Sequence, residues 1–163
     1  MKLNKLYTSL LVGLLVFTSC EKDDLCEGTD NQTPRLHISL FDQYNADNKK
    51  NADYIKAYIP GNEKYIEYNS VSDFYLPLNT TTSSTEWTLE LYDVNGTEKT
   101  LIGTENILFN YAPENIYISK ACGFKTNYNA FSYSRTSNSW IGGISLTTNN
   151  ITDESNTHLQ IYY

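Results

Sequence analysis

Two histidines are the first candidates for chemistry in this chain, because an imidazole can bind a metal ion or move a proton near neutral pH. They are His37 and His158, and each stands on the polar side of an alternating run of residues. If the first and last runs pair in one sheet, the two imidazoles approach each other on its outer face. No third ligand is evident beside them, and a metal site needs a complete ligand set. We therefore expect two surface histidines, no bound metal and no cofactor.

Motifs for catalysis are missing from the sequence. It contains no GxSxG elbow, no HExxH, no phosphate-binding loop and no dinucleotide fingerprint. Serines, threonines and acids are plentiful, but their spacing pairs no nucleophile with a base and no carboxylate with another. We expect no catalytic residues and a non-catalytic binding or accessory module. A hydrolase with an unrecognised site stays open as the alternative.

Cys20 looks like the lipidated cysteine of a bacterial lipoprotein signal. Lys2 and Lys5 precede the apolar run Leu6–Phe17, and the small residues Thr18-Ser19 stand just before the cysteine. As a helix, twelve residues span about 18 Å, against about 30 Å of bilayer hydrocarbon, so the run is too short to cross a membrane. We expect cleavage before Cys20 and acylation of that residue. An ordinary secretory signal with a chance cysteine is the alternative.

Three segments follow from this signal: residues 1–19 as the signal peptide, 20–34 as the lipidated N-terminus and polar tether, and 35–163 as a single β-domain. Removing Lys2 and Lys5 leaves 10 basic residues against 19 acidic ones, so the formal net charge changes from −7 to −9. A chain this acidic repels nucleic acid and anionic lipid surfaces. We expect no nucleic-acid partner.

The tether begins with Lys22, Asp23 and Asp24, which resemble the acidic export signal of surface-displayed lipoproteins in Bacteroidota-type Gram-negative bacteria. A solvated run of charges is the plainer interpretation. The resemblance implies a lipid-anchored protein of the outer membrane, with the cell surface favoured over the periplasmic face.

The remaining two cysteines, Cys26 and Cys122, form an even pair. Outside the cytoplasm such a pair favours a disulfide. Two separate buried thiols are the alternative, but Cys26 lies in a polar segment where a free thiol would be exposed.

From Pro34 onward the pattern is that of β-strands, because apolar and polar residues alternate with a period of two. We expect strands within residues 36–41, 54–59, 73–78, 86–91, 100–111, 115–121, 124–133, 141–148 and 158–163. Short strands separated by turn residues predict an antiparallel β-sandwich of about eight or nine strands, with a small barrel as the alternative. Asn95-Gly96 predicts a two-residue hairpin turn, and Gly142-Gly143 predicts a bulge or a close backbone approach.

Tyrosine is abundant, with fourteen residues. Its amphipathic ring makes good contact surface for a glycan or a protein, but it is also a preferred strand residue. Tyr54, Tyr58, Tyr65 and Tyr68 fall in one stretch, and Tyr128, Tyr133, Tyr162 and Tyr163 lie elsewhere. A contiguous exposed cluster would indicate binding, whereas scattered half-buried rings would indicate packing.

Four short segments are distinctive when taken together: Thr33-Pro34-Arg35-Leu36, Leu76-Pro77-Leu78-Asn79-Thr80, Asn110-Tyr111-Ala112-Pro113-Glu114 and Ala121-Cys122-Gly123-Phe124. They resemble segments of an uncharacterised domain-of-unknown-function family of Bacteroidota outer-membrane lipoproteins. The resemblance implies lipoprotein status and a partner among the outer-membrane proteins, and it brings no known activity.

Overall fold

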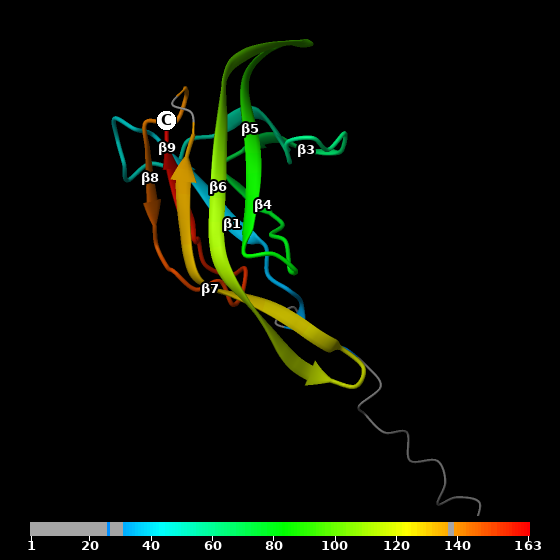
Figure 1. Cartoon of the computed structure of the whole chain (residues 1–163). Coiled ribbons are helices and arrows are strands. Elements are labelled where there is room, and N and C mark those ends of the chain that lie inside the picture. Colours follow the sequence, from blue (N-terminus) through cyan, green and yellow to red (C-terminus); the bar gives the residue numbers. More distant parts are fainter. Residues whose placement is uncertain (1–25, 27–30, 137–138) are drawn as a thin grey trace, which may run out of the picture.

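The computed structural model describes residue 26, residues 31–136 and residues 139–163. Within these residues the chain forms two β-sheets and no helix (Figure 1). The strands are β1 (Leu36–Phe41), β2 (Ala52–Tyr58), β3 (Tyr65–Val71), β4 (Asp73–Leu76), β5 (Ser84–Asn95), β6 (Glu98–Ser119), β7 (Gly123–Arg135), β8 (Gly143–Leu146) and β9 (Leu159–Tyr162). The expected β-sandwich is confirmed.

One sheet has the strand order β4-β1-β9-β8 and the other β3-β2-β5-β6-β7. All neighbours are antiparallel except β1 and β9, which run parallel with Ile38 beside Leu159. Only strands joined by a short hairpin must be antiparallel. The first and last strands share no such connection, so the expectation of a purely antiparallel sandwich is wrong at this pair.

The core lies between the sheets, where the inward side chains of each strand meet. Alternation places Leu36, Ile38 and Leu40 of β1 on this side, and all three are completely buried. The opposite sheet contributes Ile55 and Ala57 of β2, Leu89 and Leu91 of β5, and Ile107 and Phe109 of β6. The same alternation sends the polar side chains of β1 and β2 to the outer faces, and these carry the functional chemistry discussed below.

The longest strand, β6, joins the two predicted strands 100–111 and 115–121 into one. It pairs with β5 along its first half and with β7 along its second, with a register irregularity between Asn110 and Ala112. Its far end and the start of β7 project from the sandwich as a two-stranded hairpin (Figure 1). We call residues 116–125 the arm. Strand β3 was not predicted: it is an edge strand, and its inward residues Ile66 and Tyr68 are only partly buried.

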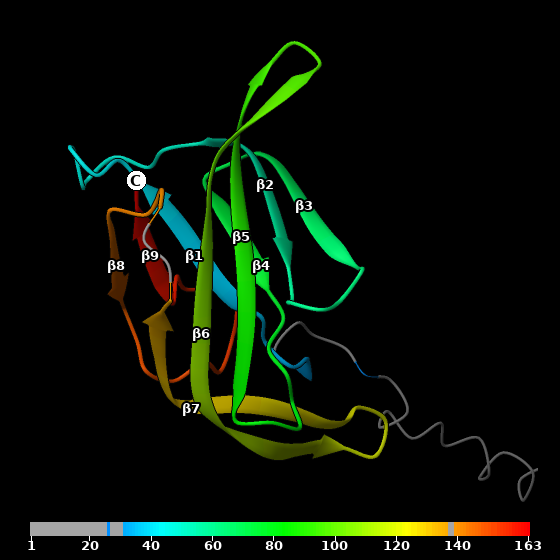
Figure 2. The same cartoon turned by 45° about the horizontal axis from the view of Figure 1, so that its top comes forward.

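The glycine predictions hold with one correction. Asn95 pairs with Glu98, so the hairpin turn is centred on Gly96-Thr97, one residue later than expected, and Gly96 has the positive φ of 64°. Figure 2 shows this hairpin at the opposite end of β6 from the arm. At Gly142 an added Cβ would collide with Oε1 of Gln43, so the close approach is confirmed here with a side chain as the neighbour.

Candidate functional site

The two histidines do meet on the outer face of the four-stranded sheet. Ile38 and Leu159 are register partners, so His37 and His158 precede them side by side, and their ring centroids lie 6.4 Å apart. The prediction that they are surface residues is wrong, because His37 is 9% exposed and His158 only 2%. The Tyr75 ring stacks on His37 at 4.5 Å. Thr157 Oγ1 lies 2.7 Å from Oγ of Ser39, the next residue of β1 on the same side as His37.

The tautomer of His158 follows from its contacts. The backbone N–H of His37 donates to Nδ1 of His158 at 2.9 Å, so Nδ1 carries no proton and the ring is neutral. Burial lowers the pKa of His158, and the nearby His37 lowers it further against the opposing effect of Asp153 and Glu154. His158 is therefore a structural acceptor.

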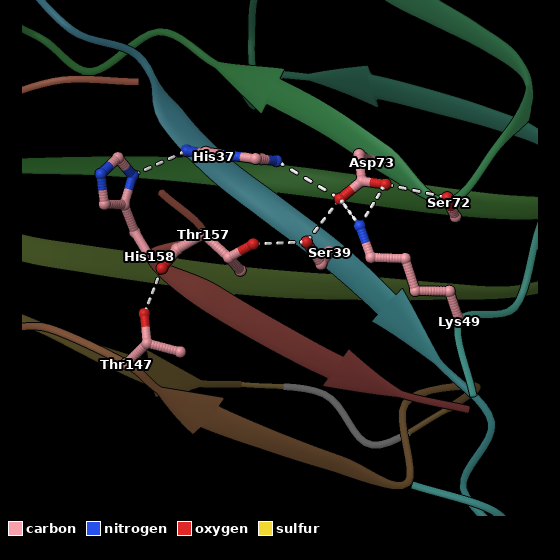
Figure 3. Close-up of polar contacts among 8 residues, drawn as sticks. All are labelled: His37, Ser39, Lys49, Ser72, Asp73, Thr147, Thr157 and His158. Atoms are coloured by element: carbon pink, nitrogen blue, oxygen red, sulfur yellow. Dashed lines mark hydrogen bonds and ion pairs between the residues drawn. The ribbon is translucent and has the colours of Figure 1, made fainter. Parts of the chain in front are cut away.

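Four side chains, with that of His37 among them, converge on the carboxylate of Asp73 (Figure 3). Ser39 Oγ donates to Oδ1 at 2.5 Å, Ser72 Oγ donates to Oδ2 at 2.8 Å, and Nε2 of His37 lies 3.3 Å from Oδ1. The Nζ atom of Lys49 contacts both oxygens, at 2.6 and 2.7 Å. We call these five residues the Asp73 cluster.

Electrostatics fixes Asp73 in its charged form. Burial alone would raise its pKa, but the hydrogen bonds from Lys49, Ser39 and Ser72 outweigh burial and hold the pKa well below its usual range. A carboxylate with such a low pKa is a poor base.

The Asp73 cluster contains a serine, a histidine and an aspartate, but it is not a catalytic triad. In a triad the histidine stands between the other two and takes the serine proton. Here Ser39 and His37 both contact the same oxygen of Asp73, and Ser39 is completely buried. No group of three or more His, Cys, Asp or Glu side chains is placed to hold a metal among the described residues. The geometry is that of a partly buried polar network that joins β1 to β4.

A different surface gathers the tyrosines. Tyr54, Lys56 and Tyr58 alternate along β2 and point outward from the five-stranded sheet, since Ile55 and Ala57 point into the core. Register partners on β3 and β5 extend this outer face, and Lys99 at the start of β6 lies over it. We call the set the tyrosine face: Tyr54, Lys56, Tyr58, Tyr65, Glu67, Glu90, Tyr92 and Lys99.

Every ring on the tyrosine face has a defined partner. Tyr54 donates its hydroxyl to Glu67, and Tyr58 and Tyr92 donate to the two oxygens of Glu90 at 3.1 and 2.8 Å. The Tyr54 and Tyr92 rings meet edge to face at 5.4 Å. Burial and the Glu90 carboxylate raise the pKa of Tyr92 to about 12, so this hydroxyl remains a donor at neutral pH.

Lysine ammonium groups lie over three of the four rings. Nζ of Lys56 is 5.3 Å from the Tyr58 centroid and 5.0 Å from that of Tyr65, and Nζ of Lys99 is 3.2 Å from that of Tyr54. The surface holds a shallow hollow of about 240 Å³ between Tyr54, Tyr65, Tyr92 and the surrounding charges. The tyrosine face as a whole is broad, and aromatic rings alternate with charged groups on it.

The tyrosine stretch noted in the sequence is thus only partly one surface. Tyr54, Tyr58 and Tyr65 share the tyrosine face, but Tyr68 points to the core side, where its ring lies 5.0 Å from Phe74. Tyr128 is completely buried, and Tyr133, Tyr162 and Tyr163 are half-buried elsewhere. Sequence reasoning missed Tyr92, Lys56 and Lys99. The i, i+2, i+4 spacing of Tyr54, Lys56 and Tyr58 was the available signal.

A further buried acid, Glu105, was also missed. It is completely buried on the core side of β6 and accepts hydrogen bonds from Nη2 of Arg135 at 3.0 Å and from the Ser139 N–H at 2.5 Å. It ties β6 to β7 and to the segment before β8, a structural role.

Cys26 and Cys122 lie at disulfide-bonding distance, with 5.0 Å between their Cα atoms. Gly123 follows with a φ of 70°, which allows the turn that presents Cys122. The predicted lipidation residue Cys20 and export residues Lys22, Asp23 and Asp24 lie outside the described residues.

Comparison with known proteins identifies a family without identifying an activity. No curated protein and no solved structure matches the chain. Among the residues that the structure describes, no helix is long and apolar enough to cross a membrane. Residues 41–163, most of the β-domain, match a family of unknown function, DUF6452. The chain belongs to that family.

Proposed function

We propose that this chain is a lipid-anchored, non-catalytic binding module of the outer membrane, and that its tyrosine face binds a protein partner in the cell envelope. The sequence supports the anchor through Cys20 and the apolar run before it. The acidic tether supports display at the cell surface.

The tyrosine face carries the binding part of the proposal. Tyrosine is enriched at protein interfaces because it offers a large contact area at a small entropic cost. The hydrogen bonds to Glu67 and Glu90 hold Tyr54, Tyr58 and Tyr92 in place before any partner arrives. A preorganised surface loses less entropy on binding.

The covered rings favour a protein over a glycan. A sugar ring stacks on an open aromatic face, whereas Lys56 and Lys99 lie over the Tyr54, Tyr58 and Tyr65 rings. A protein can instead pair with the alternating lysines and glutamates. The alternative of a hydrolase has less support, because His37 and Ser39 are buried and the Asp73 carboxylate already accepts from Lys49, Ser39 and Ser72.

A pull-down of the lipidated protein from detergent-solubilised envelopes tests the proposal. We expect an integral outer-membrane protein to be recovered and, once purified, to bind the wild-type chain directly. Tyr65→Ser and Lys99→Glu should reduce that binding at least about tenfold, the loss expected of an interface hot spot.

Tyr44→Ser is the matched control, since Tyr44 is 89% exposed but lies outside the tyrosine face. Equal binding by Tyr65→Ser and Tyr44→Ser would remove the tyrosine face from the proposal. Recovery of a polysaccharide in place of a protein would support the glycan alternative.

A further inference from the structure

The arm carries an aromatic pair that the sandwich leaves uncovered. Tyr117 on β6 and Phe124 on β7 are register partners, and their rings meet edge to face at 5.3 Å. Tyr117 is 57% exposed and Phe124 is 66% exposed. A single exposed ring is ordinary, but two rings in contact at the end of a hairpin form a contiguous apolar surface, which indicates a contact.

The charge of the arm is opposite to that of the chain. Residues 116–125 contain Lys120 and Lys125 and no acid, whereas the chain has 19 acidic residues and a formal net charge of −7. Lysines beside aromatic rings are the composition that suits the headgroup layer of a bilayer, where phosphates face the lysines and rings sit at the boundary with the acyl chains.

The disulfide places this pair close to the predicted lipid anchor. Cys122 is two residues from Phe124 and is joined to Cys26, with 5.0 Å between the Cα atoms. Six residue steps separate Cys26 from Cys20, and an extended chain covers at most about 20 Å over that length. The acylated residue therefore stays within roughly 30 Å of the aromatic pair.

The opposite end of the molecule is much farther from the anchor. Strand β6 has 22 residues, and the β5–β6 turn lies at its other end. At about 3.3 Å per residue the strand is up to about 70 Å long. The tether therefore holds the arm end of the sandwich nearer to the membrane than the β5–β6 end.

From these observations we infer that the arm is a second membrane contact, in which Tyr117 and Phe124 enter the headgroup layer of the bilayer that holds Cys20. This inference rests on the lipid anchor of the proposed function. It adds an orientation to that function: with the arm on the bilayer, the β5–β6 hairpin points away from it.

Tryptophan reporters test the contact in the mature lipidated protein, reconstituted into phosphatidylcholine vesicles that contain brominated lipid. Phe124→Trp and Tyr117→Trp are the two reporters, so the test survives if one variant folds poorly. Leu101→Trp is the matched control, because Leu101 is also on β6, is 50% exposed and lies at the far end. Trp87 and Trp140 are buried, and their emission is subtracted with the wild-type chain.

We expect the added emission at positions 124 and 117 to shift to shorter wavelength and to be quenched by the brominated lipid, and the added emission at position 101 to be unchanged. Flotation and intact mass are measured on the same samples. An acylated protein that floats with the vesicles but shows unquenched emission at both arm positions overturns the arm contact and leaves the anchor standing. A protein without acyl mass overturns the anchor, and the arm contact with it.

Discussion

The backbone N–H of His37 donates to Nδ1 of His158 at 2.9 Å, across the parallel pair β1 and β9. This hydrogen bond joins the first and last strands of the domain through a side chain that must be neutral to accept it. Protonation of the His158 imidazole at Nδ1 would therefore break this hydrogen bond between the first and last strands.

The first prediction concerns acid sensitivity. The unfolded chain has a histidine pKa near 6.5, and the folded chain has a lower one at His158 because the ring is buried. Below pH 6.5 the unfolded state binds a proton that the folded state does not, so the free energy of unfolding falls as the pH is lowered. His158→Asn keeps an acceptor oxygen near the position of Nδ1. We expect this variant to lose the dependence between pH 6.5 and 5 in urea denaturation. An unchanged pH profile would contradict the role of His158.

Asp73 gives a separate acid transition. Its pKa is well below the usual value of 3.8, so its contribution to stability is present above pH 4 and is lost as the pH falls below that value. Asp73→Asn should cost about 1–2 kcal/mol at pH 7, since the Lys49 contact is partly exposed and screened by solvent. Asp93→Asn, at an exposed position of β5, is the control and should change stability little. Equal stability of the two variants would rule out a structural role for the Asp73 cluster.

Among single substitutions of a carboxylate, Glu105→Gln should lower the stability of the domain most. It removes the charge that pairs with Arg135 in the interior, and breaking a buried ion pair costs about 3 kcal/mol. Glu98→Gln, exposed on the same strand, serves for comparison. Thermal unfolding should show a much lower midpoint for the Glu105 variant only.

The disulfide should contribute a large share of the domain's stability. Cys26 and Cys122 are 96 residues apart, and the chain-entropy model gives about 4–5 kcal/mol for closing a loop of this length. A double Cys26→Ser and Cys122→Ser variant should lose that amount in denaturant unfolding. Recovery of both cysteines as alkylatable thiols from native, never-reduced protein would contradict the bond.

Lipidation at Cys20 is tested by Cys20→Ala. We expect the variant to lack acyl mass and either to accumulate as precursor or to leave the membrane fraction. Sedimentation of the variant with membranes at its normal mass would show that the anchor is elsewhere.

Local alternation was enough to predict most strands and the sandwich, because one face of each strand is buried and the period of two is read directly from the residues. The pairing of β1 with β9 was anticipated as a condition, since it brings His37 beside His158. The burial of these histidines was not predictable from alternation. It depends on contacts between strands: the Tyr75 ring of β4 stacks on His37, and the N–H of His37 in β1 binds the His158 ring.

The tyrosine face illustrates a second limit. Spacing along β2 indicates that Tyr54, Lys56 and Tyr58 share a side, but Tyr65, Glu67, Glu90 and Tyr92 join them only through the strand order β3-β2-β5. Strand order depends on the whole fold, so the composition of the face appears only in three dimensions. Glu105 is the opposite case: alternation puts it on the core side, and Arg135, thirty residues away, together with the Ser139 N–H makes that position tolerable.

The bond between Cys26 and Cys122 also sets the route by which a mechanical load enters the domain. Tension on the chain before Cys26 passes through the sulfur atoms to the turn between β6 and β7, and from there along the axes of both strands. Both strands are pulled in the same direction, so the ladder between β6 and β5 carries the force as shear over many hydrogen bonds at once. Without the bond the same pull would act first on the chain leading into β1, where hydrogen bonds with β4 and β9 are few. In a protein held at its N-terminal end against flow, the load would therefore act on β6, its longest strand, and not on the four-stranded sheet.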